Sequence, residues 1–142
     1  MSAVRVSHAG LCVSDLAVSL RFYTEGLGFE VAEGYDVGDE VADTLEVPHG
    51  VELRSQMIVK DGTKIELLGW TSPPTHGTPS QTRNQLGLTH LSFYVDDLEA
   101  ATRHLVECGA SVIEETRASP GIDLLFLADP DGVRVELMAL PV

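Results

Sequence analysis

The sequence predicts an α+β protein made of two tandem βαβββ modules, and three observations predict this fold class. The stretch His8–Leu16 recurs as His90–Leu98, with His, Val, Asp and Leu in register. A second stretch, Asp61–Leu68, recurs in the same order as Asp131–Met138. Around these matches, segments of strand-like and helix-like periodicity follow one another in the same sequence. Two matches in the same order indicate an internal duplication.

We interpret residues 1–142 as a single domain that contains two duplicated modules. The first module covers about residues 1–70 and the second about residues 88–142. Residues 71–87 between them are rich in Pro, Gly, Ser and Thr, which favour turns and irregular structure. We therefore expect a linker there.

Each module begins with a strand that leads into a helix. Ser14-Asp15 and Asp96-Asp97 are suited to cap these helices at their N-termini. The first helix is expected from the spacing of Leu16, Leu20, Tyr23 and Leu27, and the second from that of Leu98, Ala101 and Leu105. Glycines at Gly26–Gly28 and Gly109 end them.

Three strands follow each helix. We expect them at Phe29–Ala32, Val51–Val59 and Lys64–Gly69 in the first module, and at Ser111–Glu114, Leu124–Ala128 and Val133–Ala139 in the second. The dipeptides Asp61-Gly62 and Asp131-Gly132 predict tight turns before the last strand of each module. Residues 33–50 show no clean pattern.

Composition narrows the classes of function. The chain has 9 Lys and Arg against 22 Asp and Glu, giving a net charge of −13, which disfavours nucleic-acid and anionic-membrane partners. No apolar run is long enough for a membrane span, and no signal peptide is recognisable. With Cys12 and Cys108 as the two cysteines, reduced thiols in a cytoplasmic protein are expected. A small-molecule substrate is the expected partner.

Strand alternation selects four ionisable residues. Side chains alternate between the two faces of a strand. In four of the predicted strands the apolar residues share one face, which a helix can cover, and one ionisable residue in each points to the opposite face. These residues are His8, Glu66, His90 and Glu136. If the two sheets curl toward each other, the four side chains converge. Two carboxylates close together repel, and a divalent cation removes that repulsion. Two imidazoles and two carboxylates suit a six-coordinate ion with open positions for substrate.

Other residues are candidates for contact with a substrate. Cys12 and Tyr94 lie on the predicted cavity faces, Trp70 shares the face of Glu66, and Asn84 precedes His90 by a short loop. For Trp70, core packing is an equal alternative, and for Cys12 and Asn84 a packing and a loop role are the simpler interpretations. His49 is expected in a turn, His76 in the linker and His104 on a helix surface.

The sequence resembles the vicinal oxygen chelate superfamily, which includes glyoxalase I, methylmalonyl-CoA epimerase, extradiol dioxygenases and bleomycin-resistance proteins. The resemblance covers essentially the whole chain. The resemblance rests on eight short segments of the sequence: His8, Val13–Leu16, Arg21–Tyr23, Leu27–Phe29, Lys64–Leu68, Gly87–Leu91, Asp129–Gly132 and Glu136-Leu137. It implies paired modules that form an open, barrel-like cavity, in a homodimer, with metal ligands at His8, Glu66, His90 and Glu136.

The resemblance also implies a reaction class. We expect a divalent-metal-dependent lyase or isomerase that moves a proton next to a carbonyl of a small thiol- or CoA-linked substrate. Glu136 is the first choice as proton shuttle and Glu66 the second; Ni, Co, Zn, Mn and Fe are all admissible ions. Where bacterial glutathione-dependent glyoxalases hold an Arg and an Asn for the thiol cofactor, this chain has Cys12 and Trp70. A drug-binding resistance protein and an extradiol-type dioxygenase remain the alternatives.

Overall fold

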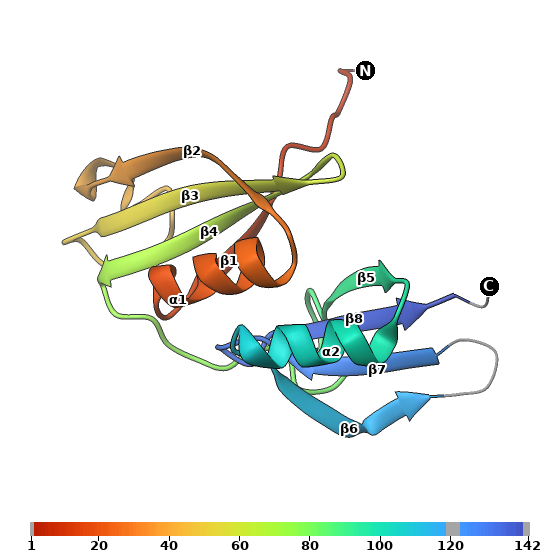
Figure 1. Cartoon of the computed structure of the whole chain (residues 1–142). Coiled ribbons are helices and arrows are strands. Elements are labelled where there is room, and N and C mark those ends of the chain that lie inside the picture. The colour runs from red at the N-terminus through yellow and green to blue at the C-terminus, as the bar shows by residue number, and fades with distance from the viewer. Residues whose placement is uncertain (1, 119–122, 141–142) are drawn as a thin grey trace. The chain divides into compact units, whose positions relative to one another are not determined.

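The computed structural model describes residues 2–118 and 123–140. The chain divides into two compact units, one of residues 1–24 and 28–76, the other of residues 25–27 and 77–142. Each unit holds one four-stranded mixed sheet and one α-helix (Figure 1). This is the α+β class that the sequence predicts. In the described residues no strand of one sheet pairs with a strand of the other, so the sheets are not closed into a barrel.

The first unit follows the predicted order. Its elements are β1 (Ala9–Val13), α1 (Leu16–Arg21), a π-helical turn (Phe22–Gly26), β2 (Glu30–Val37), a 3₁₀ turn (Asp39–Val41), β3 (Glu52–Lys60) and β4 (Thr63–Ser72). The sheet order is β1-β4-β3-β2, with β1 parallel to β4 and the other pairs antiparallel. Strand β4 runs to Ser72, into the predicted linker, and β2 runs to Val37, beyond the predicted end.

The first helix departs from the prediction. Asp15 caps it as expected, accepting a hydrogen bond from the Val18 N–H, but α1 ends at Arg21 and a π-helical turn follows. The wider turn buries both Phe22 and Tyr23 completely, with their rings edge to face at 5.1 Å.

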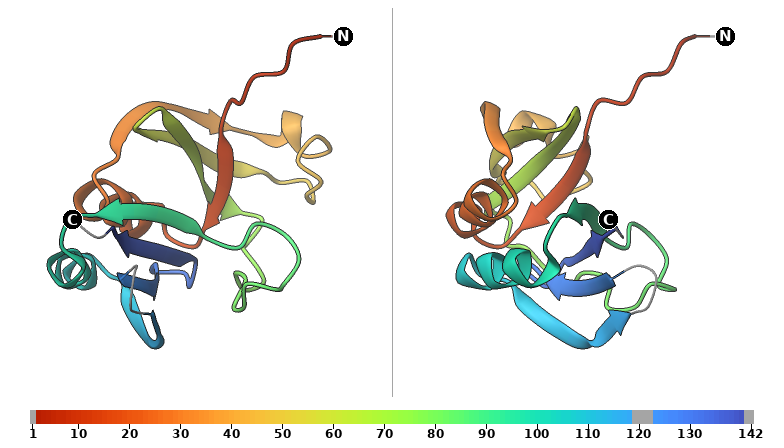
Figure 2. Two further views of the ribbon diagram at one scale, coloured as in Figure 1. Left: turned by 90° about the vertical axis from the view of Figure 1, so that its right-hand side faces the viewer. Right: turned by 45° about the vertical axis from the view of Figure 1, so that its right-hand side comes forward.

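The helix covers one face of the first sheet. At Gly69 of β4, an added Cβ would lie 2.9 Å from the Leu16 side chain, so helix and strand are in direct contact there. Ile65 and Leu67 are buried on that face. The views in Figures 1 and 2 agree that α1 lies against the sheet. Glu66, between these two residues, therefore points to the opposite face.

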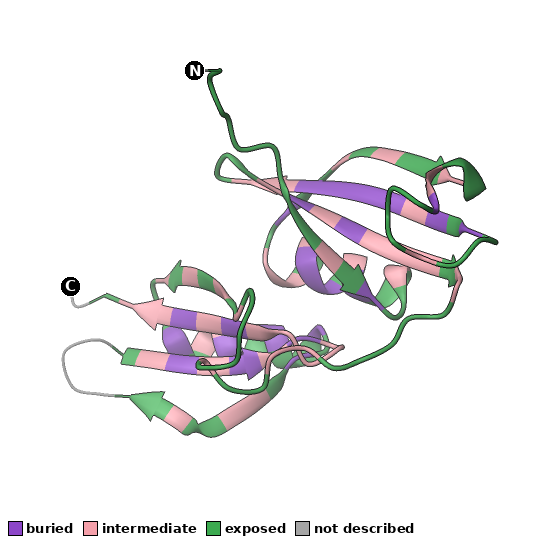
Figure 3. Cartoon of the chain, turned by 180° about the vertical axis from the view of Figure 1, so that it is seen from behind, coloured by how far each residue is buried: buried purple, intermediate pink, exposed green. Residues whose placement is uncertain are grey.

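The second unit repeats the plan. Its elements are β5 (Leu91–Val95), α2 (Leu98–Glu107), β6 (Ser111–Ala118), β7 (Asp123–Ala128) and β8 (Arg134–Ala139), in the order β5-β8-β7-β6. Asp97 caps α2 through the Ala100 N–H. Buried residues alternate with half-buried ones along β7 and β8, as Figure 3 shows. Leu125, Leu127, Val135 and Leu137 form the buried face.

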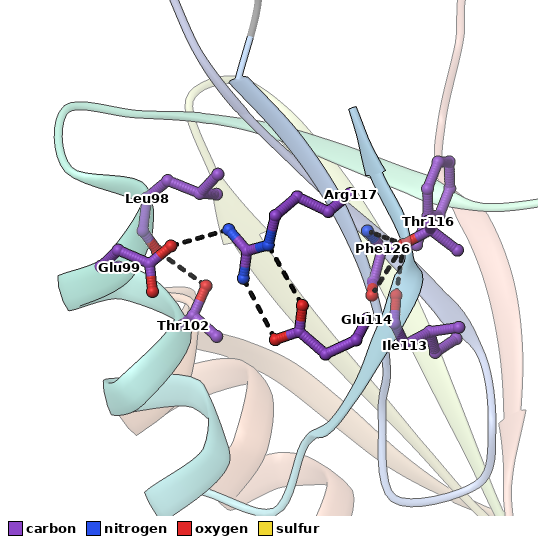
Figure 4. Close-up of polar contacts among 8 residues, drawn as sticks. All are labelled: Leu98, Glu99, Thr102, Ile113, Glu114, Thr116, Arg117 and Phe126. Carbon is purple, nitrogen blue, oxygen red and sulfur yellow. Dashed lines mark hydrogen bonds and ion pairs between the residues drawn. The ribbon is translucent and has the colours of Figure 1, made fainter. Parts of the chain in front are cut away.

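Two polar contacts fix the outer strand of the second sheet (Figure 4). The ladder between β6 and β7 is interrupted after Ile113, and Thr116 fills the gap: its hydroxyl donates to the Ile113 carbonyl and accepts from the Phe126 N–H. The Arg117 guanidinium donates hydrogen bonds to the carboxylates of Glu114 on β6 and Glu99 on α2, and so links the strand to the helix. These two carboxylates raise the pKa of Arg117, so the guanidinium stays charged.

Two predicted details agree with the structure. The Asp61-Gly62 dipeptide forms a two-residue hairpin with both residues at positive φ (49° and 76°), as a type I′ turn requires. Gly28 and Gly109 take positive φ after the helices. None of the helices in the described part of the chain is long and apolar enough to cross a membrane.

Candidate functional site

In the first unit, His8 and Glu66 form a pair. His8 directly precedes β1, and Glu66 lies on β4 opposite Gly10. Because residues two apart on a strand share a face, both side chains leave the sheet on the side away from α1. His8 Nε2 lies 3.5 Å from Glu66 Oε1, and the side chains are 32% and 20% exposed. The pair is thus partly enclosed but open to solutes.

The second unit contains the equivalent pair. His90 directly precedes β5, and Glu136 lies on β8 opposite Ser92. His90 Nε2 lies 3.7 Å from Glu136 Oε1, with side chains 30% and 14% exposed. The Phe126 ring stands edge to face beside the imidazole, with centroids 5.3 Å apart. Each unit therefore brings together one imidazole and one carboxylate at the same place in its sheet.

A hydroxyl group orients each imidazole. The Ser7 Oγ lies 2.7 Å from His8 Nδ1, and the Thr89 Oγ1 lies 2.7 Å from His90 Nδ1. A hydrogen bond at Nδ1 leaves Nε2 as the ring nitrogen that faces the carboxylate and can bind a ligand. Sequence reasoning missed this feature, although both hydroxyl residues directly precede a histidine in the repeat.

A serine also holds each carboxylate, but from different places. Ser55 on β3 donates to Glu66 Oε2 at 2.5 Å, and Ser92 on β5 donates to Glu136 Oε1 at 2.7 Å. Ser55 is buried, at 4% exposure, whereas Ser92 is exposed. The repeat aligns Ser92 with Gly10, so comparing the two halves of the sequence could not reveal this pair of serines.

The other predicted residues fall on or near these faces. Cys12 is exposed on the face of Glu66, and Tyr94, 71% exposed, lies on the face of Glu136. Trp70 is half-buried and packs against the small core of Ala42, Val51 and Leu53. Asn84 is exposed in the turn that follows Thr82. His49 lies in a turn, where it contacts Asp39 and Asp43. Within the described residues of either unit, no third His, Cys, Asp or Glu completes a metal-binding group.

Comparison with known proteins identifies the family. The sequence model of the Glyoxalase/Bleomycin resistance protein/Dioxygenase superfamily matches residues 5–137. The chain belongs to this superfamily. It is 34% identical over 139 residues to the uncharacterized protein YaeR of Escherichia coli (94% of both chains). It is 32% identical over 142 residues to the ethylmalonyl-CoA/methylmalonyl-CoA epimerase of Cereibacter sphaeroides (94% of this chain, 96% of the other).

Solved structures of the superfamily share the fold. A glyoxalase family protein from Bacillus cereus superposes with a TM-score of 0.83 at 20% identity, covering 99% of this chain and 97% of the other. The fosfomycin resistance protein FosX from Listeria monocytogenes, complexed with Mn(II), superposes with a TM-score of 0.62 at 19% identity (99% and 96% covered). The superfamily includes lyases, epimerases and dioxygenases, and its members commonly use divalent metal ions.

Proposed function

We propose that this chain is a divalent-metal-dependent lyase or isomerase. Its reaction would move a proton at the carbon next to a carbonyl group in a small thiol- or CoA-linked substrate. One observation carries the proposal: a His–Glu pair is built twice, with the same hydroxyl support on each imidazole. The epimerase relative supports the choice of proton transfer.

The side chains present fit a divalent ion. In each unit an imidazole Nε2 and a carboxylate oxygen lie within 4 Å and face each other, and imidazole and carboxylate are ligands that such ions accept. His8, Glu66, His90 and Glu136 would hold the ion, contributed by one chain or by two chains of a homodimer. When bound, the ion would supply Lewis acidity at the substrate carbonyl, which offsets the negative charge that develops on its oxygen.

The two carboxylates differ in their freedom to move a proton. Glu66 is held by the buried Ser55 through one oxygen, while its other oxygen faces His8. Glu136 uses Oε1 for both Ser92 and His90, so no hydrogen bond from the described residues holds its Oε2. Glu136 can therefore take the substrate proton and return it, while Glu66 remains a fixed ligand.

Metal analysis tests the proposal first. Protein purified without added metal is analysed for Ni, Co, Zn, Mn and Fe, and then titrated with each ion. We expect stoichiometric binding, with a loss of affinity in His8→Ala and in His90→Ala. His76→Ala is the matched control, because His76 is exposed in the loop between the units. Retention of full affinity in both site variants would refute the shared site.

A substrate screen tests the reaction. Hemithioacetals and acyl-CoA epimers are offered to the protein loaded with each ion, and we expect turnover of at least one compound. Tight, stoichiometric binding of an aromatic drug without metal would favour a resistance protein, with Trp70 and Tyr94 as walls. Ring cleavage of a catechol with iron would favour the dioxygenase alternative.

A further inference from the structure

The face of the second sheet that carries Glu136 also carries two arginines. Arg134 lies two residues before Glu136 on β8, so both side chains leave the sheet on the same side. The register places Phe126 opposite Glu136, and Ala128 opposite Arg134. Phe126 therefore belongs to this face as well. Ser92 on β5 also belongs to this face, and His90, directly before β5, lies two residues earlier.

Arg83 comes to this face from the loop before β5. Its guanidinium carbon lies 5.4 Å from the centre of the Phe126 ring, an arrangement typical of a cation–π contact. The same guanidinium donates to the carbonyls of Ser80 and Thr89 at 2.9 and 2.7 Å. These bonds hold the loop and fix the charge beside Phe126, whose ring also borders His90.

The two arginines lack a negative partner. Five cationic side chains of the described residues are half-buried, and three of them form ion pairs: Arg54 with Asp36, Lys60 with Asp61 and Lys64 with Glu33. For Arg83 and Arg134, no carboxylate of the described residues lies within 4 Å, and their identified hydrogen bonds go to backbone carbonyls. In a chain with 22 acidic and 9 basic residues, this is an unusual concentration of unpaired positive charge.

The charge of Arg134 also acts on Arg83. Burial lowers the pKa of Arg83, and the positive charge of Arg134 lowers it further. Two like charges held near one another without a counterion are unfavourable, and an anion between them would relieve the repulsion. Each guanidinium still has N–H donors left to bind an oxyanion, since Arg83 uses two of its groups and Arg134 one.

We propose that Arg83 and Arg134 form an oxyanion subsite beside the His90–Glu136 pair, which selects a substrate that carries a carboxylate or phosphate group. Guanidinium groups bind both kinds of oxyanion through charge-assisted hydrogen bonds. As a statement about the substrate, the inference rests on the proposed function; as a statement about anion binding, it stands on the second unit alone.

Binding of an anion to the metal-free protein tests the subsite directly. The full chain is titrated with inorganic phosphate and, separately, with acetate, by calorimetry at about 0.15 M ionic strength. We expect saturable binding of at least one anion, which identifies the preferred oxyanion. Arg134→Gln should weaken it at least about tenfold, because a charge-assisted contact is lost. Arg83→Gln should weaken it similarly, and Arg83→Lys less.

Arg103→Gln is the matched control. It removes one positive charge from the same unit at an exposed position on α2, and we expect it to leave anion affinity unchanged within a factor of about two. Circular dichroism of each variant checks that the loop substitution at Arg83 has not unfolded the unit. Equal losses in Arg134→Gln and Arg103→Gln would show a general charge effect and overturn the proposal, as would the absence of saturable binding.

A separate metal titration distinguishes this inference from the proposed function. Metal binding without anion binding would refute the oxyanion subsite and leave the proposed metal site standing. Anion binding without metal binding would refute the metal site and leave the oxyanion subsite standing. If both hold, the metal should tighten anion binding, because it offsets the charge of the nearby Glu136 carboxylate. A decrease in metal affinity of Arg134→Gln with no change in anion affinity would mean that Arg134 serves Glu136 instead, and would also overturn the proposal.

Discussion

The two His–Glu pairs have the same parts but different supports. In the first unit, the carboxylate of Glu66 is fixed by Ser55, a buried residue on a neighbouring strand. In the second, the Glu136 carboxylate accepts a hydrogen bond from Ser92, an exposed residue on the strand that follows His90. The histidines are supported alike, each by the hydroxyl residue that precedes it.

Under the proposed function, this difference predicts separate roles for the two carboxylates. A buried hydroxyl cannot be replaced by water at no cost, so Glu66 is held firmly in one position. An exposed hydroxyl competes with solvent, so Glu136 can leave its partner and return. In the proposed site, duplication would supply two equivalent carboxylates, and the unequal serines would make Glu66 a fixed ligand and Glu136 a mobile one.

Exchanging each glutamate for glutamine gives the largest expected effect. Glu136→Gln should lower turnover by about 10²–10⁴-fold while metal stays bound, because the amide cannot accept the substrate proton. Glu66→Gln should instead weaken metal binding. Steady-state kinetics and metal content are measured on the same samples, with Glu115→Gln, an exposed position on β6, as the control. Full activity in Glu136→Gln would remove that residue from the mechanism.

The serines provide a sharper comparison. Ser55→Ala should lower metal affinity by about 10- to 100-fold, the range seen for groups that orient a ligand. Ser92→Ala should lower it only a few-fold, since water can take the place of an exposed hydroxyl. Competitive titration against a chromogenic chelator measures both. Equal effects would show that the two carboxylates are held alike.

The units also differ in how they fix their irregular strands. The ladder between β2 and β3 is interrupted after Val31, and the Gln56 amide donates there to the carbonyls of Ala32 and Glu33. Thr116 has the corresponding role between β6 and β7. Gln56→Leu and Thr116→Val should each lower the free energy of unfolding by about 1 kcal/mol, because partly buried backbone groups lose their partners. Urea unfolding checks this, with Thr44→Val, at an exposed position, as the control.

Much of the fold could be predicted from the sequence because its signals are local. Capping aspartates, turn dipeptides and alternating apolar residues act within a few positions, and Asp15, Asp97 and Asp61-Gly62 all behave as expected. The π-helical turn after Arg21 was not predicted, because the spacing of Leu16, Leu20, Tyr23 and Leu27 indicates only a regular helix. Tertiary packing decides such a choice.

The candidate site shows the same division. Alternation along single strands predicted the side of the sheet to which each His and Glu side chain points. It did not predict the roles of Ser55 and Arg83, since each depends on a partner that is distant in sequence: Ser55 needs the register between β3 and β4, and Arg83 needs a loop that folds onto Phe126. Whether the four ligands bind one ion remains a prediction.

The smallest expected effect concerns a contact in the segment that joins β2 to β3 in the first unit. There, Asp39 accepts hydrogen bonds from the N–H groups of Val51 and Gly50 and pairs with His49 at 3.0 Å. These contacts, led by that of Val51, lower the pKa of Asp39, and the bond to Asp39 raises the pKa of His49.

The direction of the pH effect follows from these shifts. A raised histidine pKa gives stability that is complete below the ordinary value of 6.5 and is lost as pH rises through the folded value. A lowered aspartate pKa gives stability that is present above 3.8 and is lost in more acidic solution. The pair therefore stabilises the folded state most between these two pH limits, and only slightly, because both groups are exposed.

His49→Asn should lower the Tm at pH 5.5 more than at pH 8.5. Trp70, the single tryptophan, packs against the adjacent core, so its fluorescence follows unfolding of the first unit. His76→Asn should show no such difference, and an equal change in Tm at both pH values would assign His49 a purely steric role.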